Sequence, residues 1–231
     1  MDRAVVLLSG GVNSAVAAAL TKEQCEPALL HVAWGHRTAE RELAAFNELA
    51  AALKVEQTLV AELSCMAVIG GNARASRRLA IEDANVVGRS VPATFALGLL
   101  PSMLSLAAAW AGALRARRII VGVGENYGTT TTPLCKLYPD RRREFIQAFN
   151  LMLLYAKPAD RDLVAEAPLL DLTRAEVVKL GQKLKVPFDR TWTCYSSNNA
   201  PCHRCIACVN REAGFLQAGV PDPLVLETAK A

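Results

Sequence analysis

The feature that most constrains this chain is a strand, a tight turn and a helix at its N-terminus. Residues 4–8 form an uncharged apolar run that leads directly into Ser9-Gly10-Gly11-Val12-Asn13-Ser14, and residues 15–20 predict a helix. Adjacent glycines let the backbone adopt positive φ and approach a ligand, and the first N–H groups of a helix have no partner within it. The turn is therefore a candidate phosphate site, although similar turns occur in proteins that bind no nucleotide.

Strands and helices alternate along the rest of the chain. Apolar runs predict strands at 28–33, 58–63 and 118–123, and helical spacing predicts helices at 39–53, 102–114, 140–155 and 168–184. Thr38 is the predicted cap of the first of these helices. Asp171 or Thr173 is the predicted cap of the last, and Glu176 would complete a capping box with Thr173. The pattern predicts an α/β fold with a doubly wound, mainly parallel, Rossmann-like sheet. We expect one such domain at 1–188 and a tail at 189–231 packed on it.

Composition narrows the class of partner and the compartment. The net charge of +4 in 231 residues permits an anionic ligand but lacks the basic bias of a nucleic-acid-binding protein, so no stable nucleic-acid partner is expected. The N-terminal apolar run enters the glycine turn at once and does not resemble a signal peptide. We therefore expect a cytoplasmic protein.

One long uncharged stretch raises the alternative of a membrane segment. Residues 90–114 carry no charge and are numerous enough to cross a bilayer. Pro92, Gly98 and Pro101 interrupt the first half, and the continuous helical part reaches only about 20 Å at about 1.5 Å per residue. The alanine-rich sequence favours a helix buried against the sheet, and no membrane partner is expected.

Two polar segments are expected near the carboxyl ends of the strands. Residues 66–91 suit a long excursion whose arginines, Arg74, Arg77 and Arg78, either clamp an anion or form a solvated surface, with the second favoured. Residues 124–132 follow a predicted strand and would lie beside the glycine turn, where open α/β sheets bind ligands. The threonine run within them is equally consistent with an ordinary linker.

The tail carries a compact group of cysteines. Cys194, Cys202, Cys205 and Cys208 have the spacing C-x7-C-x2-C-x2-C. Four thiolates so close in sequence can close a tetrahedral zinc site, which we favour over an iron–sulfur cluster or a metal-free group of thiols. A closed four-thiolate site leaves no position for a substrate, so the predicted role is structural. Cys25, Cys65 and Cys135 are scattered and are read as ordinary thiols.

The two ends of the chain together resemble a known family. The N-terminal turn resembles the Ser-Gly-Gly-x-Asp-Ser loop of the PP-loop ATP pyrophosphatases, which implies a sheet of the PP-loop type. Trp34-Gly35-His36-Arg37, Tyr138-Pro139-Asp140 and Thr191-Trp192-Thr193-Cys194-Tyr195 resemble, in order, segments of the 7-cyano-7-deazaguanine synthases within that superfamily. The resemblance covers nearly the whole chain and is most specific in the cysteine tail.

The resemblance implies a reaction and a set of site residues. These synthases convert 7-carboxy-7-deazaguanine and ammonia to the nitrile through an adenylated intermediate, with ATP as substrate, Mg²⁺ on the pyrophosphate and zinc in the tail. A homodimer is the implied assembly, and the partners are the deazapurine and ammonia. The implied catalytic residues are Asn13, Asp140 and Arg37; the implied ATP-binding residues are Leu8, Ser9, Gly10, Gly11, Val12, Asn13 and Ser14; the metal ligands are the tail cysteines Cys194, Cys202, Cys205 and Cys208.

Departures from the family pattern fall on positions that carry chemistry. Asn13 replaces an aspartate, Leu99-Leu100 stands where an Arg-Asn pair is expected, and Arg141 follows Asp140 where the family usually has cysteine. This pattern fits a diverged synthase. It also fits a PP-loop paralogue that adenylates another acceptor, such as a protein, a tRNA or a small carboxylate, and it fits a non-catalytic nucleotide-binding protein.

Overall fold

A parallel sheet with strand order β3-β2-β1-β4-β5 lies at the centre of the fold. The computed structural model describes residues 2–87, 91–124 and 137–228. Leu7 of β1 lies opposite Leu30 of β2 and Val121 of β4, so β1 is central and the strand order reverses beside it. Ligands of open α/β sheets bind outside the carboxyl ends of the strands at such a point. The strands are β1 (Arg3–Leu7), β2 (Glu26–Ala33), β3 (Thr58–Glu62), β4 (Arg118–Val121) and β5 (Val164–Glu166).

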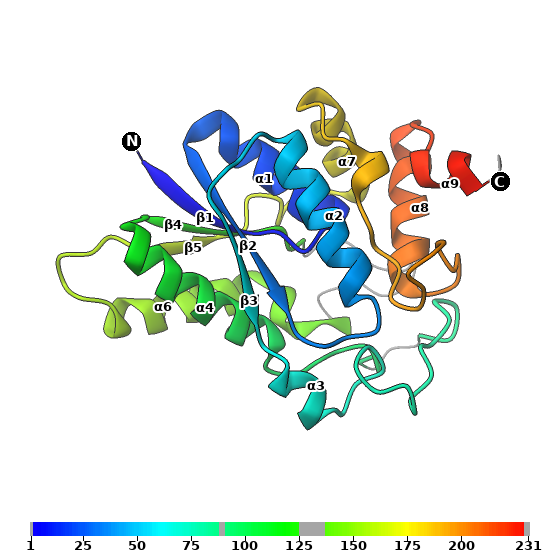
Figure 1. The fold of residues 1–231 in the computed structure, drawn as a ribbon, viewed down its shortest axis with the longest axis horizontal. Coiled ribbons are helices and arrows are strands. Elements are labelled where there is room, and N and C mark those ends of the chain that lie inside the picture. Colours follow the sequence, from blue (N-terminus) through cyan, green and yellow to red (C-terminus); the bar gives the residue numbers. More distant parts are fainter. Residues whose placement is uncertain (1, 88–90, 125–136, 229–231) are drawn as a thin grey trace.

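Helices cover both faces of the sheet (Figure 1). On one face lie α1 (Val12–Gln24), α2 (Ala39–Ala52), α7 (Arg174–Lys183) and α8 (Ile206–Ala218). On the other face lie α4 (Leu99–Leu114) and α6 (Arg143–Ala156). The short elements are α3 (Cys65–Ile69), η1 (Pro139–Arg141), η2 (Phe188–Arg190) and α9 (Pro223–Thr228). The expected doubly wound α/β architecture is confirmed.

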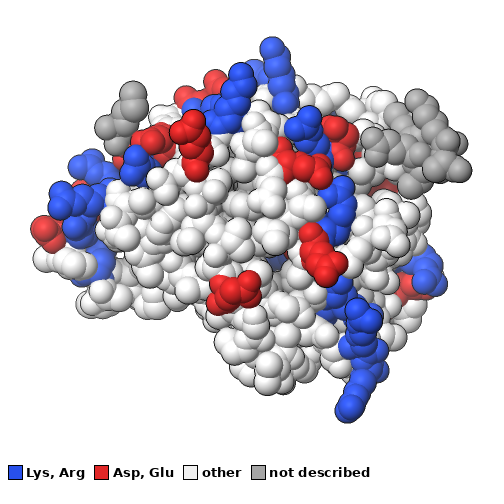
Figure 2. Space-filling model, in the orientation of Figure 1, with Lys and Arg blue, Asp and Glu red and all other residues white. Residues whose placement is uncertain are grey.

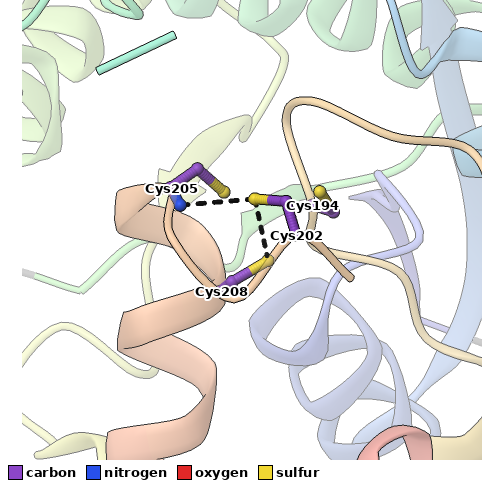
Figure 3. Close-up of side chains that lie close together, drawn as sticks. All are labelled: Cys194, Cys202, Cys205 and Cys208. Carbon is purple, nitrogen blue, oxygen red and sulfur yellow. Dashed lines mark hydrogen bonds between the residues drawn. The ribbon is translucent and has the colours of Figure 1, made fainter. Parts of the chain in front are cut away.

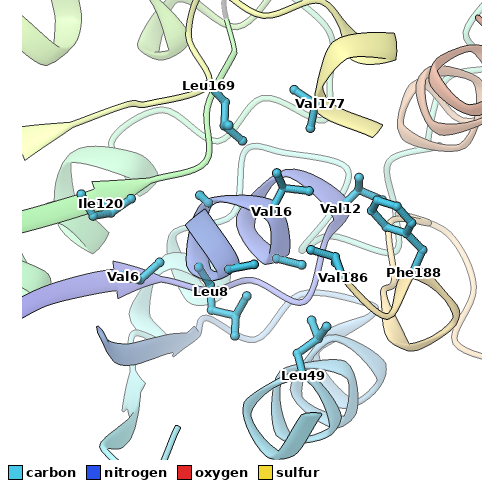
Figure 4. Packing of buried hydrophobic residues seen from close by; sticks show 14 of the residues in the cluster. Val6, Leu8, Val12, Val16, Leu49, Ile120, Leu169, Val177, Val186 and Phe188 are labelled. Carbon is cyan, nitrogen blue, oxygen red and sulfur yellow. The ribbon is translucent and has the colours of Figure 1, made fainter. Parts of the chain in front are cut away.

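Alternate residues of β1 supply two separate cores. Val6 packs with the α1 side and Val5 with the α4 side, because successive side chains of a strand point to opposite faces. Figure 4 shows apolar side chains from strands, helices and the segment around Phe188 gathered about α1. Gly181 of α7 permits this packing, since a Cβ there would lie 2.4 Å from the Phe188 ring and 2.8 Å from Val16. The tail is thereby held close to α1.

Most of the predicted elements are present, with instructive differences at their ends. The capping box of Thr173 and Glu176 is confirmed, and α7 begins directly after Thr173 instead of at residue 168. Thr38 precedes α2 as expected but makes no capping bond; its hydroxyl donates to the Glu42 carboxylate at 3.1 Å. The short strand β5 and the helix α8 were not predicted. The division into a domain and a tail at residue 188 stays a prediction.

The uncharged stretch forms a helix packed on the sheet. Leu104, Ala107 and Ala111 of α4 are fully buried against the strands, as the buried-helix interpretation predicts. Within the described ranges, none of the helices has both the length and the apolar character needed to cross a membrane. The connection predicted at 124–132 and Cys135 lie outside the described residues, apart from Gly124.

Candidate functional site

A cavity of about 300 Å³ opens at the carboxyl ends of β1 and β4. Its wall combines the glycine turn after β1, the residues that follow β4, the start of α4 and parts of the tail. These segments are far apart in sequence, and the strand order brings them together at the switch point. Of the predicted ATP-binding and catalytic residues, the cavity is lined by Leu8, Ser9, Gly11, Val12, Asn13, Ser14 and Asp140.

The glycine turn is shaped by its own hydroxyls and by one glycine. The Ser9 N–H donates to Ser14 Oγ at 3.2 Å, and the Ser14 hydroxyl donates to the Gly11 carbonyl at 3.0 Å. Gly10 has φ +88°, and a Cβ there would lie 2.8 Å from the Glu42 carbonyl oxygen. Gly11 caps α1 without any side-chain hydrogen bond to the first turn, so the helix N-terminus faces the cavity as a potential anion site.

The turn is held in place by neighbours on both sides. A Cβ on Gly122, just after β4, would lie 2.8 Å from the Asn13 backbone, so only glycine allows the two segments to approach this closely. On the opposite side, the Trp192 N–H donates to the Gly10 carbonyl at 2.8 Å. The tail therefore contacts the glycine turn, the candidate phosphate site, directly. This contact carries no signal in the sequence, because it is made by backbone atoms.

Arg37 lies apart from the other predicted catalytic residues. It does not line the cavity, and its guanidinium donates to the backbone carbonyls of Ser76 and Leu79. Its backbone N–H donates to the Arg74 carbonyl at 2.9 Å. The structure therefore does not bring Arg37 to the cavity together with Asn13 and Asp140, and its catalytic role stays a prediction. Arg37 fixes the position of the 74–79 segment, whose arginine Arg74 does reach the cavity.

Arg74 belongs to a buried polar cluster beside the cavity. Its guanidinium donates to Glu42 Oε1 at 3.2 Å and lies over the rings of Trp34 and Tyr195, at 4.9 and 4.4 Å from their centroids. His36 Nε2 is 2.9 Å from the same carboxylate oxygen. Burial acts to raise the pKa of Glu42, but His36 and Arg74 lower it on balance. The sequence left open whether Arg74 clamps an anion or belongs to a solvated surface. Its buried contacts show that Arg74 is not a solvated surface group.

Asp140 and Arg141 form a polar corner of the cavity wall in η1. Burial raises the pKa of Asp140, and the positive charge of Arg141 partly offsets this. A carboxyl with a raised pKa can exchange a proton near neutral pH more readily than an ordinary aspartate. Arg141 lies over the Tyr138 ring at 4.6 Å, and the Tyr138 hydroxyl is 2.7 Å from Thr94 Oγ1. Leu99 and Leu100 line the same cavity.

His31 is a cavity-lining residue that the sequence did not single out. It lies on β2 and is 1% exposed, with Nδ1 3.2 Å from the Leu8 carbonyl oxygen. Since a carbonyl only accepts, this contact favours the tautomer with the proton on Nδ1. Burial lowers the pKa of His31 and keeps the ring neutral. Nε2 is buried with no hydrogen-bond partner among the described residues. A histidine inside an apolar strand run gives no signal that separates this position from a core histidine.

The tail cysteines converge as the spacing predicts. The sulfur atoms of Cys194, Cys202, Cys205 and Cys208 all lie within 4.8 Å of one another, as Figure 3 shows. Tetrahedral zinc with Zn–S bonds of about 2.3 Å requires sulfurs about 3.8 Å apart. The Cys202 and Cys208 sulfurs are 3.9 Å apart, and the Cys205 N–H donates to Cys202 Sγ at 3.3 Å. The donor set and its spacing fit a metal ion.

A buried ion pair anchors the tail to the cavity wall. Arg211 of α8 donates to both carboxylate oxygens of Asp222, at 2.6 and 2.8 Å, and its Nη1 donates to Thr191 Oγ1 at 2.7 Å. Arg211 lines the cavity, and Thr191 immediately precedes Trp192. The charge of Arg211 therefore holds the chain that reaches the glycine turn. No motif in the sequence indicated this pairing.

These features define a doubly wound α/β enzyme with a ligand cavity at the switch point and a potential metal centre in its tail. Residues 3–219 match the family described as "Queuosine biosynthesis protein QueC". The chain belongs to this family. The resemblance seen in its loops and tail is thereby confirmed.

Curated relatives are similar over almost the whole length. A "7-cyano-7-deazaguanine synthase" from Chloroherpeton thalassium is 33% identical, with 96% of each chain covered. Enzymes of the same name from Koribacter versatilis and Methanothrix thermoacetophila are 36% and 32% identical, with 96% of this chain and 92% and 98% of theirs covered. The match extends from the glycine turn to the cysteine tail.

Proposed function

We propose that this enzyme is an ATP-dependent 7-cyano-7-deazaguanine synthase. The observation that carries the proposal is the cavity itself, which joins a helix N-terminus suited to phosphates to a corner with a carboxyl and a guanidinium. Family membership supplies the substrate class: the relatives are named for the nitrile product. The substrates are then 7-carboxy-7-deazaguanine, ammonia and ATP.

The chemistry requires two activations of one carbon atom. A carboxylate oxygen attacks the α-phosphorus of ATP and pyrophosphate leaves; ammonia then displaces AMP and gives the amide. The amide oxygen attacks the α-phosphorus of a second ATP and pyrophosphate leaves again; loss of AMP and of the two N–H protons then forms the nitrile. The protein must hold the reacting groups together, neutralise charge and accept protons.

Each of these tasks has a candidate group in the cavity. The N-terminus of α1, with Ser9 and Ser14, binds phosphate oxygens through N–H and hydroxyl donors. Asp140 accepts a proton when ammonia attacks or when the amide is dehydrated, which its raised pKa favours. Arg37 acts as a positioning residue through the 74–79 segment.

Mg²⁺ would neutralise the pyrophosphate as it leaves, and the cavity offers oxygen ligands for it. Asn13 lines the cavity and has an amide oxygen, which is a neutral ligand of the kind Mg²⁺ accepts. Asn13 lacks the negative charge of the aspartate expected from the resemblance, so more of the metal's charge is left for the phosphates to balance.

For the tail we propose a structural zinc ion held by the four cysteines. The four sulfurs fill a tetrahedral shell, so this site has no open position for substrate. Zinc analysis of the purified protein should give about one ion per chain, and Cys208→Ser should lower that content and the melting temperature. An ultraviolet–visible spectrum with iron–sulfur absorption would contradict this assignment and favour a cluster.

A homodimer is the proposed assembly. Helix α6 has large apolar side chains open to solvent, with Leu151 at 56%, Leu154 at 59% and Tyr155 at 83% exposure. Such a group on a helix face is what a self-association surface needs. Light scattering after size exclusion tests this directly: a single species at monomer mass at micromolar concentration would contradict it.

The same cavity supports a second candidate, an adenylating enzyme with a different acceptor. Leu99 and Leu100 give the cavity an apolar wall where the resemblance leads us to expect Arg and Asn. A tRNA acceptor would need a continuous basic surface. On the face in Figure 2, acidic and basic side chains are interspersed and separated by broad uncharged areas. On this face, the charge distribution favours a small carboxylate over a tRNA as the alternative acceptor.

The deciding experiment measures AMP release from ATP with 7-carboxy-7-deazaguanine and ammonium, together with mass spectrometry of the product. The proposed function predicts AMP that depends on the deazapurine, and a nitrile product. An acceptor-free reaction is the control. ATP binding without turnover would favour the second candidate, and the same assay with other small carboxylates would then identify the acceptor.

A further inference from the structure

We propose that Arg141 binds the carboxylate of the acceptor and so determines which acceptors enter the cavity. This inference rests on the proposed function, since it assigns the group that recognises the substrate's carboxylate. Neither the helix N-terminus nor the cysteine cluster is involved.

The arginines that line the cavity differ in whether a carboxylate pairs with them. Among the described residues that line it, the guanidiniums are those of Arg74, Arg141, Arg174 and Arg211. Arg211 is paired with Asp222, and Arg74 with Glu42. Arg174 also has an interaction partner. Arg141 has no carboxylate of the described residues within ion-pairing distance, although it lines the same cavity.

The guanidinium of Arg141 is supported by an aromatic ring. The guanidinium carbon lies 4.6 Å from the centre of the Tyr138 ring, and Tyr195 lines the same cavity. The Tyr138 hydroxyl is fixed in turn by Thr94. The Tyr138 ring therefore supports the guanidinium without neutralising it, and Asp140 acts on its charge without forming an ion pair. A cation–π contact leaves the N–H donors of the guanidinium for a ligand.

The guanidinium of Arg141 and its surroundings match a carboxylate ligand in chemistry. A guanidinium presents a planar set of N–H donors that can bond both oxygens of a carboxylate. Leu99 and Leu100 contribute apolar wall to the same cavity, and few water molecules compete for an ion pair beside such a wall. Asp140, the neighbour of Arg141, repels a bound carboxylate when it is ionised, so the positive charge of Arg141 is what allows a carboxylate to bind here. The corner is thus suited to one carboxylate with a nearby proton acceptor.

The test compares ligands that differ only by the carboxylate. Calorimetry would measure binding of 7-carboxy-7-deazaguanine, of 7-deazaguanine and of ATP to the full-length protein and to Arg141→Met. We expect Arg141→Met to weaken binding of the carboxylate ligand on the order of 10- to 100-fold, which is the effect of losing a hydrogen-bonded charge pair. Binding of 7-deazaguanine and of ATP should change less than about threefold, within the scatter of neutral contacts.

A matched control separates local from general charge effects. Arg77→Met removes the same charge from an exposed position outside the cavity and should leave all affinities unchanged. Arg141→Lys keeps the charge but loses the planar donor set, and should recover only part of the affinity.

The failure of this inference can be told apart from failure of the proposed function. If the wild-type protein binds the carboxylate and Arg141→Met binds it equally well, the inference is wrong and the proposed function stands. If Arg141→Met weakens ATP instead, Arg141 binds phosphate and the inference is overturned. If the wild-type protein binds neither deazapurine, the proposed function is contradicted, and the assignment of Arg141 with it.

Discussion

Two parts of the cavity wall, which we call the phosphate end and the acceptor end after their proposed ligands, are built from different chemical groups. At the phosphate end, residues 9–14, the shape comes from backbone groups, two serine hydroxyls and the positive φ of Gly10. At the acceptor end, defined by Asp140, Arg141, Leu99 and Leu100, the wall is made of side chains. A backbone site keeps its ability to bind phosphate when side chains change, whereas a side-chain site changes its ligand with each substitution. Under the proposed function, the departures from the family pattern at 99, 100 and 141 therefore affect the acceptor more than ATP.

The largest expected effect is at the acceptor end, on Asp140. Asp140→Asn should lower kcat by a factor on the order of 10² to 10⁴, the usual cost of losing a proton acceptor. In the wild-type enzyme the rate should rise with pH as Asp140 ionises, at a pH above the usual aspartate range because burial raises its pKa. The pH profile of kcat checks this. A variant that keeps the same acid limb would show that another group accepts the proton.

The phosphate end should respond most strongly to a change in backbone freedom. Gly10→Ala places a Cβ 2.8 Å from the Glu42 carbonyl oxygen and 2.9 Å from the Ala45 Cβ, at a φ of +88°. We expect the free energy of unfolding to fall by about 2–4 kcal/mol. Urea denaturation measures it.

Gly11→Ala is the matched control for that prediction. Gly11 has φ −81°, and the nearest atom to a Cβ there would be Ser9 Oγ at 3.5 Å, an ordinary contact. Its effect should be about 1 kcal/mol or less. Equal losses in the two variants would mean that the turn is not held in the conformation described.

A smaller effect is expected from restoring a charge at the phosphate end. Asn13→Asp places a carboxylate at the N-terminus of α1, where the helix dipole favours it, and gives Mg²⁺ a charged ligand. The Mg²⁺-dependent kcat/KM for ATP should rise by about three- to tenfold. A titration of activity against Mg²⁺ concentration checks this. No change in a protein that still binds ATP would favour the non-catalytic interpretation of the family departures.

The smallest effect concerns the support of Arg141. Tyr138→Phe removes the hydroxyl that lies 2.7 Å from Thr94 Oγ1 but keeps the ring under the guanidinium. The free energy of unfolding should fall by about 1 kcal/mol, the typical net value of one hydrogen bond. Affinity for the carboxylate ligand should change less than about threefold. A loss as large as that of Arg141→Met would mean that the hydroxyl, and not the ring, keeps Arg141 in place.

The same difference between backbone and side chains explains what the sequence could predict. Apolar runs and helical spacing located four of the strands and the helices α1, α2, α4, α6 and α7, but not α8. Strands β1, β2 and β4 are largely buried, and burial on two faces leaves a clear apolar pattern. Strand β5 has three residues, with Val164 exposed, and so leaves almost none. The glycine turn and the cysteines were found because their chemistry depends on residue type and local spacing.

The remaining site residues depend on contacts between distant segments. Arg74 reaches Glu42, Arg211 reaches Asp222, and His31 meets the Leu8 carbonyl, all across folds of the chain that no local pattern encodes. Arg37 was singled out from a local motif, and its contacts with the Ser76 and Leu79 carbonyls could not be predicted from that motif.

The hydrogen bond from the Trp192 N–H to the Gly10 carbonyl connects two sites thermodynamically. Cys194, a proposed metal ligand, lies two residues further along the same extended segment. If the metal orders this segment, it also orders the turn proposed to bind ATP. Linkage then requires that nucleotide strengthen metal binding by the same factor by which metal strengthens nucleotide binding. The concentration of chelator needed to strip the protein should therefore increase when ATP is present.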